Sequence, residues 1–199
     1  MMPTDSLRSH LDMLLISALS GCAYCVIHLF NGWALRGLEF SAHISLIYLP
    51  GFLRLVNVLV LGLFWGTLGT VLGGLMLLFW LQEPLSLGLS NIAMSAGSAL
   101  VAVLLMRLLL GRRVVLAHVW DLLRLALLYA LLNALMHHVL WSWLDPSQLV
   151  APEQLVYMVV GDINGAIIGA LLLRWIARRM SLIDKLRSRS DTDGWPPSA

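Results

Sequence analysis

Long apolar runs dominate the sequence from residue 11 to residue 177. Runs of about 20 apolar residues alternate with short segments of Gly, Pro or charged residues, and this is the length that a helix needs to cross the hydrocarbon core of a bilayer. Charged residues form 12% of the chain and hydrophobic residues 59%, whereas an ordinary soluble domain has about 25% charged residues. The sequence therefore predicts an all-α polytopic membrane protein.

Six of these runs fit membrane-spanning helices, so we expect a bundle of about six transmembrane helices. Their predicted bounds are 11–32, 44–62, 64–82, 89–110, 115–143 and 154–177. The second and third runs are joined by the short uncharged segment GLFWG. Two alternatives therefore stay open for 44–82: a single bent element, or a re-entrant segment that begins at Pro50 and Gly51.

Polar segments flank this predicted transmembrane domain, which we place at 11–180. Residues 1–10 form a polar N-terminus, and residues 181–199 form a basic tail with Ser and Pro that is expected to be disordered. With six spans, the arginines of the tail fall on the same side as Arg8, Arg112 and Arg113. Because Lys and Arg collect on the cytoplasmic side of membrane proteins, both termini of this multi-pass protein are predicted to be cytoplasmic.

Asp162 and Asn164 interrupt the last apolar run, VVGDINGAIIGALLLRW. A charged side chain at the centre of a membrane helix costs roughly 2.5 to 3.5 kcal/mol, so it is expected to have an internal partner or to face a water-filled cavity. Counted from the outer polar flanks, Asp162 lies roughly 13 Å deep and Arg54 roughly 16 Å deep. The sequence therefore predicts that Arg54 and Asp162 pair in the outer half of the bundle. This pair either lines a ligand cavity or only locks two helices together.

Other polar residues fall at a similar depth. His137 lies roughly 10 to 12 Å from the outer flank of its run, and Asn133 lies one helical turn away on the same face. We therefore include both with Arg54, Asp162 and Asn164 among the candidate ligand or signal-coupling residues. Neighbouring histidines point about 100° apart on a helix, so at most one of His137 and His138 can join a given site. We predict no metal site and no cofactor.

Glycines recur at short intervals in two of the runs. One series comprises Gly62, Gly66, Gly69 and Gly73, and the other comprises Gly161, Gly165 and Gly169. Small residues at such spacings let membrane helices approach each other closely. These glycines are predicted to pack helices together, inside the bundle or, as an alternative, in a homo-oligomer.

Two segments, ISLIYLPGFLRLVNVLVLGLFWGTLGTVLGG and VVGDINGAIIGALLLRW, resemble the integral membrane-associated sensor domains of bacteria. Tyr48, Pro50 and Gly51 match the aromatic-Pro-Gly element of that family. The glycines and the aspartate of GDING and the later Trp175 match its Gly-Asp-x-x-Gly element. The resemblance implies a sensory module of the bacterial inner membrane and adds Tyr48 to the candidate ligand or signal-coupling residues. The family usually has about eight spans and a fused kinase or cyclic-di-nucleotide domain, whereas six spans and no such domain are predicted for this chain.

The sequence thus favours a sensory or regulatory membrane module that perceives a small molecule or a membrane state. It would lie in the lipid bilayer and act through a partner such as a kinase or cyclase. The alternative is the substrate-binding component of an energy-coupling-factor-type or other small-solute transporter, whose partner would be a transport module. A structural subunit of a larger complex is a third possibility. No enzyme activity is predicted, because the sequence contains no Ser-His-Asp or Cys-His set, HExxH motif or carboxylate pair at a shared depth. No nucleic-acid partner is expected.

Overall fold

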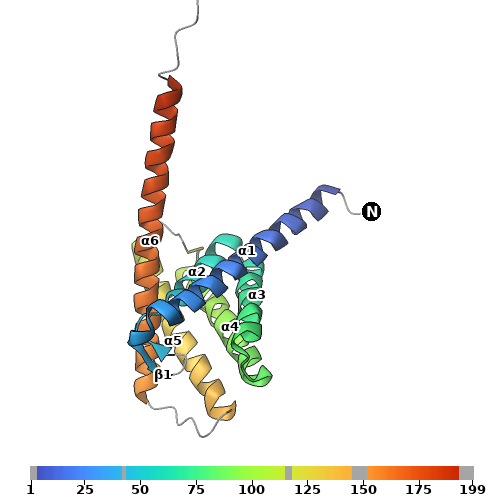
Figure 1. Cartoon of the computed structure of the whole chain (residues 1–199), viewed down its shortest axis with the longest axis vertical. Helices are drawn as coiled ribbons and strands as arrows, with labels where there is room; N and C mark the ends of the chain where they lie inside the picture. The colour runs from blue at the N-terminus through green and yellow to red at the C-terminus, as the bar shows by residue number, and fades with distance from the viewer. Residues whose placement is uncertain (1–3, 42–43, 115–117, 145–151, 193–199) are drawn as a thin grey trace, which may run out of the picture.

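The computed structural model describes residues 4–41, 44–114, 118–144 and 152–192, and this part of the chain is almost entirely helical (Figure 1). Within these residues there are six α-helices, one 3-10 turn and a two-stranded hairpin. The helices are α1 (Thr4–Ala34), α2 (Leu49–Leu61), α3 (Leu63–Leu81), α4 (Leu85–Leu110), α5 (Val119–Leu144) and α6 (Pro152–Thr192). The 3-10 turn η1 (Arg36–Leu38) leads into the antiparallel strands β1 (Glu39–Ser41) and β2 (Ile44–Ser45).

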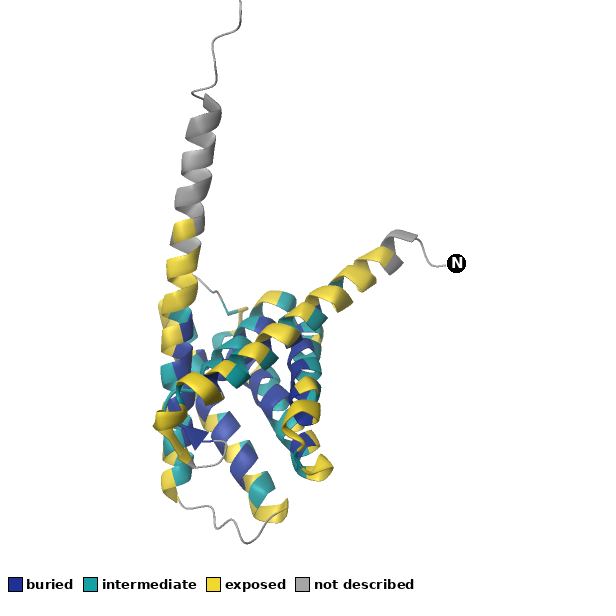
Figure 2. Ribbon diagram, in the orientation of Figure 1, coloured by how far each residue is buried: buried dark blue, intermediate teal, exposed yellow. Residues whose placement is uncertain are grey.

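Five of these helices, all except α2, are long and apolar enough to cross a membrane. Large apolar side chains stand on their outer faces, where Phe79 is 81% exposed and Leu108 is 77% exposed. Many more are exposed in the same way on the outside of the bundle (Figure 2). A soluble monomer rarely exposes apolar patches of more than a few hundred Å². The chain is therefore a multi-pass, all-α membrane protein, as the sequence predicted.

The predicted span at 44–62 is wrong in length. Only Leu49–Leu61 is helical there, and 13 residues rise about 20 Å, which is too short for a core of about 30 Å. Pro50 lies in the first turn of α2, where its missing N–H costs no helical hydrogen bond. The residues before it instead form β2 and an irregular connection with bends at residues 46 and 47, in which the N–H of Leu46 donates to the carbonyl of Leu38 at 2.9 Å. The hairpin thus replaces the first part of the expected span.

Helices α2 and α3 are separate, so 44–82 is not a single bent element. They meet at Gly62, whose φ of 87° is a backbone conformation that residues with a side chain rarely adopt. A Cβ added at Gly62 would have no atom within 4 Å. Gly62 therefore forms the turn between two helices and is not the helix-packing residue that the sequence predicted.

The other glycines of α3 pack against neighbouring helices. A Cβ at Gly66 would collide with the backbone of Asn57 in α2, and one at Gly73 would collide with the backbone of Gly21 in α1. Gly69 lies against the same part of α1, since a Cβ at Gly21 would come within 2.8 Å of the Gly69 carbonyl. The prediction of close packing is confirmed for these positions, and the partners lie inside the bundle.

The glycines of α6 pack in the same way on the segment that enters α2. A Cβ at Gly161 would collide with the carbonyl of Ser45, and one at Gly165 with the carbonyl of Tyr48. A Cβ at Gly169 would collide with a phenylalanine ring of α2. The Tyr48 N–H also donates to the Gly161 carbonyl at 2.9 Å. This prediction is confirmed. The packing at these glycines holds α2 and the hairpin against α6.

The elements surround a core formed by α2, α4 and α5, with α1 lying obliquely across α2 and α3 (Figure 1). Buried apolar side chains fill this core, among them Leu55, Val58, Val103, Leu125 and Tyr129. The first strand and the turn between α3 and α4 lie toward one end of the bundle, whereas the start of α1 and the end of α6 project from the other (Figure 1). The two described ends of the chain therefore leave the bundle on the same side.

Helix α6 continues to Thr192, beyond the predicted end at 177. The sequence predicted a disordered tail from residue 181, but 181–192 is helical. This segment contains Leu, Arg and Lys, which have good helix propensity, and it extends an existing helix without a new nucleation step. Residues 193–199 of the predicted tail lie outside the described residues.

An ion pair joins Arg112, just after α4, to Asp121 in the first turn of α5, at the end opposite the hairpin. Asp121 accepts hydrogen bonds from both terminal nitrogens of Arg112, at 2.6 and 3.0 Å. The bond to Asp121 raises the pKa of Arg112 above its usual value, so Arg112 is charged at any physiological pH.

Candidate ligand-binding cavity

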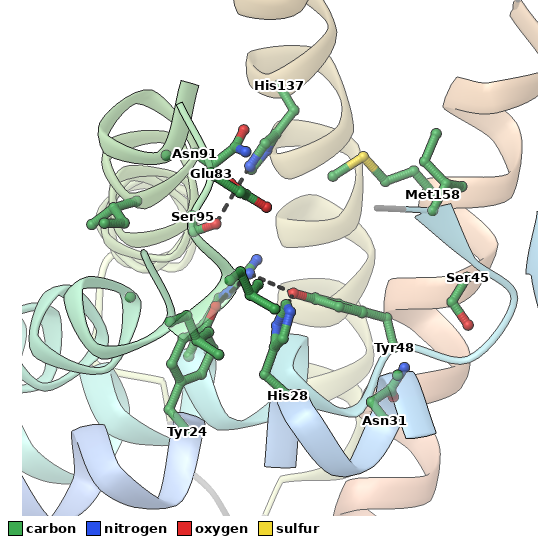
Figure 3. Close-up of a pocket in the computed structure, with 18 of the residues that line it drawn as sticks. Tyr24, His28, Asn31, Ser45, Tyr48, Glu83, Asn91, Ser95, His137 and Met158 are labelled. Atoms are coloured by element: carbon green, nitrogen blue, oxygen red, sulfur yellow. Dashed lines mark hydrogen bonds between the residues drawn. The ribbon is translucent and has the colours of Figure 1, made fainter. Parts of the chain in front are cut away.

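A cavity of about 420 Å³ lies in the half of the bundle that contains the hairpin and the turn between α3 and α4. This is within the range of about 300 to 1,000 Å³ found for small-molecule sites. Figure 3 shows polar side chains from several elements gathered around it. The polar residues that line it include Tyr24, His28, Asn31, Arg36, Glu39, Tyr48, Arg54, Glu83, Asn91, Ser95, His137 and Asp162. In the predicted orientation this half of the bundle faces away from the cytoplasm.

Arg54 of α2 is 3% exposed and is held by neutral oxygen atoms. Its Nε and Nη2 donate to the hydroxyl of Tyr24 at 3.2 and 2.7 Å, and Nη2 also donates to the hydroxyl of Tyr48 at 2.9 Å. Its Nη1 donates to the hydroxyl of Tyr129 at 3.0 Å and to Oδ1 of Asn133 at 3.4 Å. A guanidinium has five N–H donors, so these five hydrogen bonds use all of them.

Aromatic faces stabilise the same charge. The guanidinium carbon of Arg54 lies 5.4 Å from the ring centroid of Tyr24 and 5.2 Å from that of Tyr48, distances at which a cation is attracted to an aromatic ring. The Tyr48 hydroxyl also lies 3.1 Å from Nδ1 of His28. Helix α1 therefore contributes directly to the binding of Arg54 through Tyr24, and Tyr48, the residue before α2, contacts α1 through His28.

Asp162 of α6 pairs with Arg54 through a bridging side chain and not by direct contact. Asn133 of α5 lies between them: its Nδ2 donates to Oδ2 of Asp162 at 2.7 Å, while its Oδ1 accepts from Arg54. The depth calculation placed the two charges at the same height, but height alone does not give their separation within the membrane plane. The structure connects them through one amide.

The second carboxylate oxygen of Asp162 has no hydrogen-bond partner. Asp162 is 1% exposed and lines the cavity. Its Oδ1 lies 2.6 Å from the position that a Cβ of Gly51 would occupy, and the Tyr129 hydroxyl lies 3.4 Å from the same position. Gly51 thus leaves room for the carboxylate beside α2.

His137 lines the cavity as predicted, and its ring orientation is fixed by two contacts. Its Nδ1 donates to the carbonyl of Asn133 at 2.8 Å, so the neutral ring accepts at Nε2, where the hydroxyl of Ser95 lies 3.4 Å away (Figure 3). The next residue, His138, donates from Nδ1 to the carbonyl of Ala134 and is absent from the cavity wall. Among the described residues no group of three or more His, Cys, Asp or Glu is placed to hold a metal ion.

Asn164 does not belong to the cavity, although the sequence placed it among the candidate ligand residues. Its Nδ2 donates to the carbonyl of Leu46 at 2.8 Å. That carbonyl belongs to the connection between β2 and α2 and lies outside any regular ladder. Asn164 therefore satisfies a loop carbonyl and helps to hold the connection on α6.

The structure also brings in side chains that the sequence did not single out, mainly Tyr24, Tyr129, Asn31 and Ser98. Two of them bind Arg54, and the Ser98 hydroxyl donates to Oδ1 of Asn133 at 3.0 Å. Oδ1 of Asn31 accepts from the N–H of Leu49 at 2.9 Å and so satisfies a free donor at the start of α2. One signal was present for Tyr129, which precedes the polar Asn133 by one helical turn and so shares its face.

Comparison with family models, with curated proteins and with solved structures gave no match.

Proposed function

We propose that this protein is a sensory or regulatory module of the bacterial inner membrane that binds a small molecule in the cavity and acts through a partner protein. The observation behind this proposal is that the cavity lies directly against Arg54 and the side chains that bind it. A ligand there touches Tyr24, Tyr48, Arg54 and Asp162, which come from α1, from α2 and the residue before it, and from α6. A purely structural lock between two helices needs no such cavity.

The hydrogen bonds of Arg54 and Asn133 connect the cavity to the packing of several helices. Arg54 binds side chains of α1 and α5, and Asn133 of α5 continues to Asp162 of α6. A ligand changes a conformational equilibrium only by contacting the two states differently. With Ser98 of α4, which also binds Asn133, five helices share this network, so a ligand that exchanges a single hydrogen bond alters the balance between their arrangements.

The transporter alternative would need a small-residue face on an early span that is free to meet a transport module. In α3 the glycines at 66, 69 and 73 pack against α1 and α2, and Gly74 packs against Ile92 of α4. These small residues are therefore used within the bundle, and we favour sensing over transport.

Ligand binding is tested with the purified full-length chain in detergent, screened against small metabolites by thermal unfolding. Ser95 lines the cavity and is 6% exposed, so Ser95→Phe should fill the cavity. Ser86→Phe is the matched control, because Ser86 lies on the same helix and is exposed. We expect ligands that raise the Tm of the wild type and of Ser86→Phe but not of Ser95→Phe. Equal stabilisation of both variants would show that binding occurs outside the cavity.

The partner is tested by crosslinking in native membranes, followed by identification of the crosslinked protein. Recovery of a kinase or a nucleotide cyclase, with a yield that changes when the ligand is added, supports the sensory proposal. Recovery of a membrane coupling subunit with an ATPase would overturn it in favour of transport.

A further inference from the structure

We propose that the cavity binds an organic ammonium ion with a compact apolar body, and that the carboxylate of Asp162 is its counter-charge. This inference rests on the proposed function, namely that the cavity holds a small molecule, and it specifies the chemical class of that molecule.

The first observation is that Arg54 is saturated. A carboxylate or phosphate ligand is normally recognised by two parallel N–H bonds from a guanidinium. All five N–H donors of Arg54 already bind the tyrosine hydroxyls and Asn133. An anion could use Arg54 only by displacing one of these buried partners, which would then have to be satisfied elsewhere.

The second observation is the unused acceptor on Asp162. One carboxylate oxygen is bound by Asn133, and the other has no partner although the side chain is 1% exposed. A buried acceptor without a partner costs free energy, and more so when it is charged. A ligand that brings an N⁺–H donor removes this cost, whereas a ligand with only acceptors increases it.

The third observation is the charge of the cavity wall. Three carboxylates line it, Glu39, Glu83 and Asp162, against two guanidinium groups, Arg36 and Arg54. The wall therefore has an excess of one negative charge when the histidines are neutral. Because Arg54 has no free donor, the local preference near Asp162 is for a cation.

The fourth observation is the apolar part of the wall, which includes Ile44, Leu77, Leu78 and Met158. A bare metal ion would gain nothing from these side chains and would need several oxygen ligands, typically six to eight for Ca²⁺. An amine with an aromatic or branched hydrocarbon body uses both parts of the wall: its nitrogen meets Asp162, and its apolar part is removed from water.

The test compares three probes of similar size: 2-phenylethylammonium, 2-phenylethanol and 3-phenylpropionate. Their affinities for the full-length chain are measured in detergent by calorimetry, for the wild type and for the Ser95→Phe variant. We expect the ammonium probe to bind at least ten times more tightly than the alcohol or the carboxylate. Filling the cavity in Ser95→Phe should abolish binding of every probe that the wild type binds.

Asp162→Asn tests the counter-charge. This variant should lose the preference for the ammonium over the alcohol and keep whatever affinity the alcohol has. If Asp162→Asn does not fold, the ratio of the three affinities in the wild type still decides the matter.

The outcomes separate this inference from the proposed function. Cavity-dependent binding of the alcohol or carboxylate as tight as that of the ammonium would overturn the inference and leave the ligand-binding proposal intact. No binding of the ammonium probe would overturn the inference for this class. Failure of every metabolite in the wider screen would overturn the proposed function as well.

Discussion

The electrostatic coupling between Arg54 and Asp162 can be predicted from the geometry of the bridge between them. The two hydrogen bonds, 3.4 Å from Arg54 to Asn133 and 2.7 Å from Asn133 to Asp162, put the charges on the order of 8 Å apart at most. At this distance and an effective dielectric constant of about 20, the Coulomb energy is about 2 kcal/mol, against about 4 kcal/mol for a pair 4 Å apart. The bridged pair should therefore have about half the coupling of a direct one.

A double-mutant cycle with Arg54→Gln and Asp162→Asn measures this coupling. Each single change leaves one buried charge without its counter-charge, and Arg54→Gln also removes hydrogen bonds to the tyrosines, so it should be the more destabilising. The double variant should be about 2 kcal/mol more stable than the sum of the single effects predicts. The free energy of unfolding is measured by reversible unfolding of the purified protein in mixed detergent micelles.

The control cycle combines Arg54→Gln with Asp121→Asn. Asp121 lies eight residues, or about 12 Å, along α5 from Tyr129, and its charge is bound by a loop arginine. This cycle should be additive within about 0.5 kcal/mol. Additivity of the first cycle would refute the bridged coupling, and a coupling near 4 kcal/mol would mean that the two charges touch.

Three further predictions follow from packing, pairing and orientation. Gly165→Ala should destabilise the bundle by about 1 to 3 kcal/mol or more, because the added Cβ would meet a backbone carbonyl. Gly32→Ala should not, because a Cβ at Gly32 has open space around it. Equal free energies of unfolding for the two variants would contradict this prediction. Arg112→Gln should destabilise more than Asp121→Asn in the same assay, because it leaves the 2% exposed Asp121 without its arginine, whereas Arg112 itself is half exposed and can reach water. The reverse order would show that the carboxylate is already satisfied by the start of α5. In a background without native cysteines, Ser86→Cys should react with an impermeant maleimide from outside the cell and Arg112→Cys only after lysis; labelling of both from outside would refute the predicted orientation.

The sequence was sufficient to predict most of the spans and to bring several polar residues to one cavity. Apolar length marks a membrane helix because the bilayer imposes it, and a rise of 1.5 Å per residue converts position into height. Arg54, Asp162 and His137 consequently do line the same cavity. Glycine spacing likewise predicted close packing at Gly165 and its neighbours, since a missing side chain allows backbones to approach.

The same reasoning failed where the outcome depended on a direction within the membrane plane or on a local backbone choice. Height does not show which face of α5 meets α2, so the bridge through Asn133 was missed. The glycine pattern did not distinguish Gly62, which forms a turn, from Gly66, which packs against a helix. Nor did an apolar run reveal that the residues before Pro50 pair as a hairpin, because their side chains suit a strand as well as a membrane helix.

The way in which the bundle holds Arg54 bears directly on what Asp162 can do. A carboxylate in direct contact with an arginine accepts hydrogen bonds from its guanidinium group, and the carboxylate oxygens are then occupied. Here the tyrosine hydroxyls and Asn133 satisfy the guanidinium without any anion, and the aromatic rings stabilise its charge. Asp162 is therefore close enough to Arg54 to be stabilised by its field, yet it keeps one oxygen without a partner. A buried ion pair separated by a single amide in this way leaves one carboxylate oxygen without a partner, in a side chain that lines the cavity, which a direct salt bridge would not do.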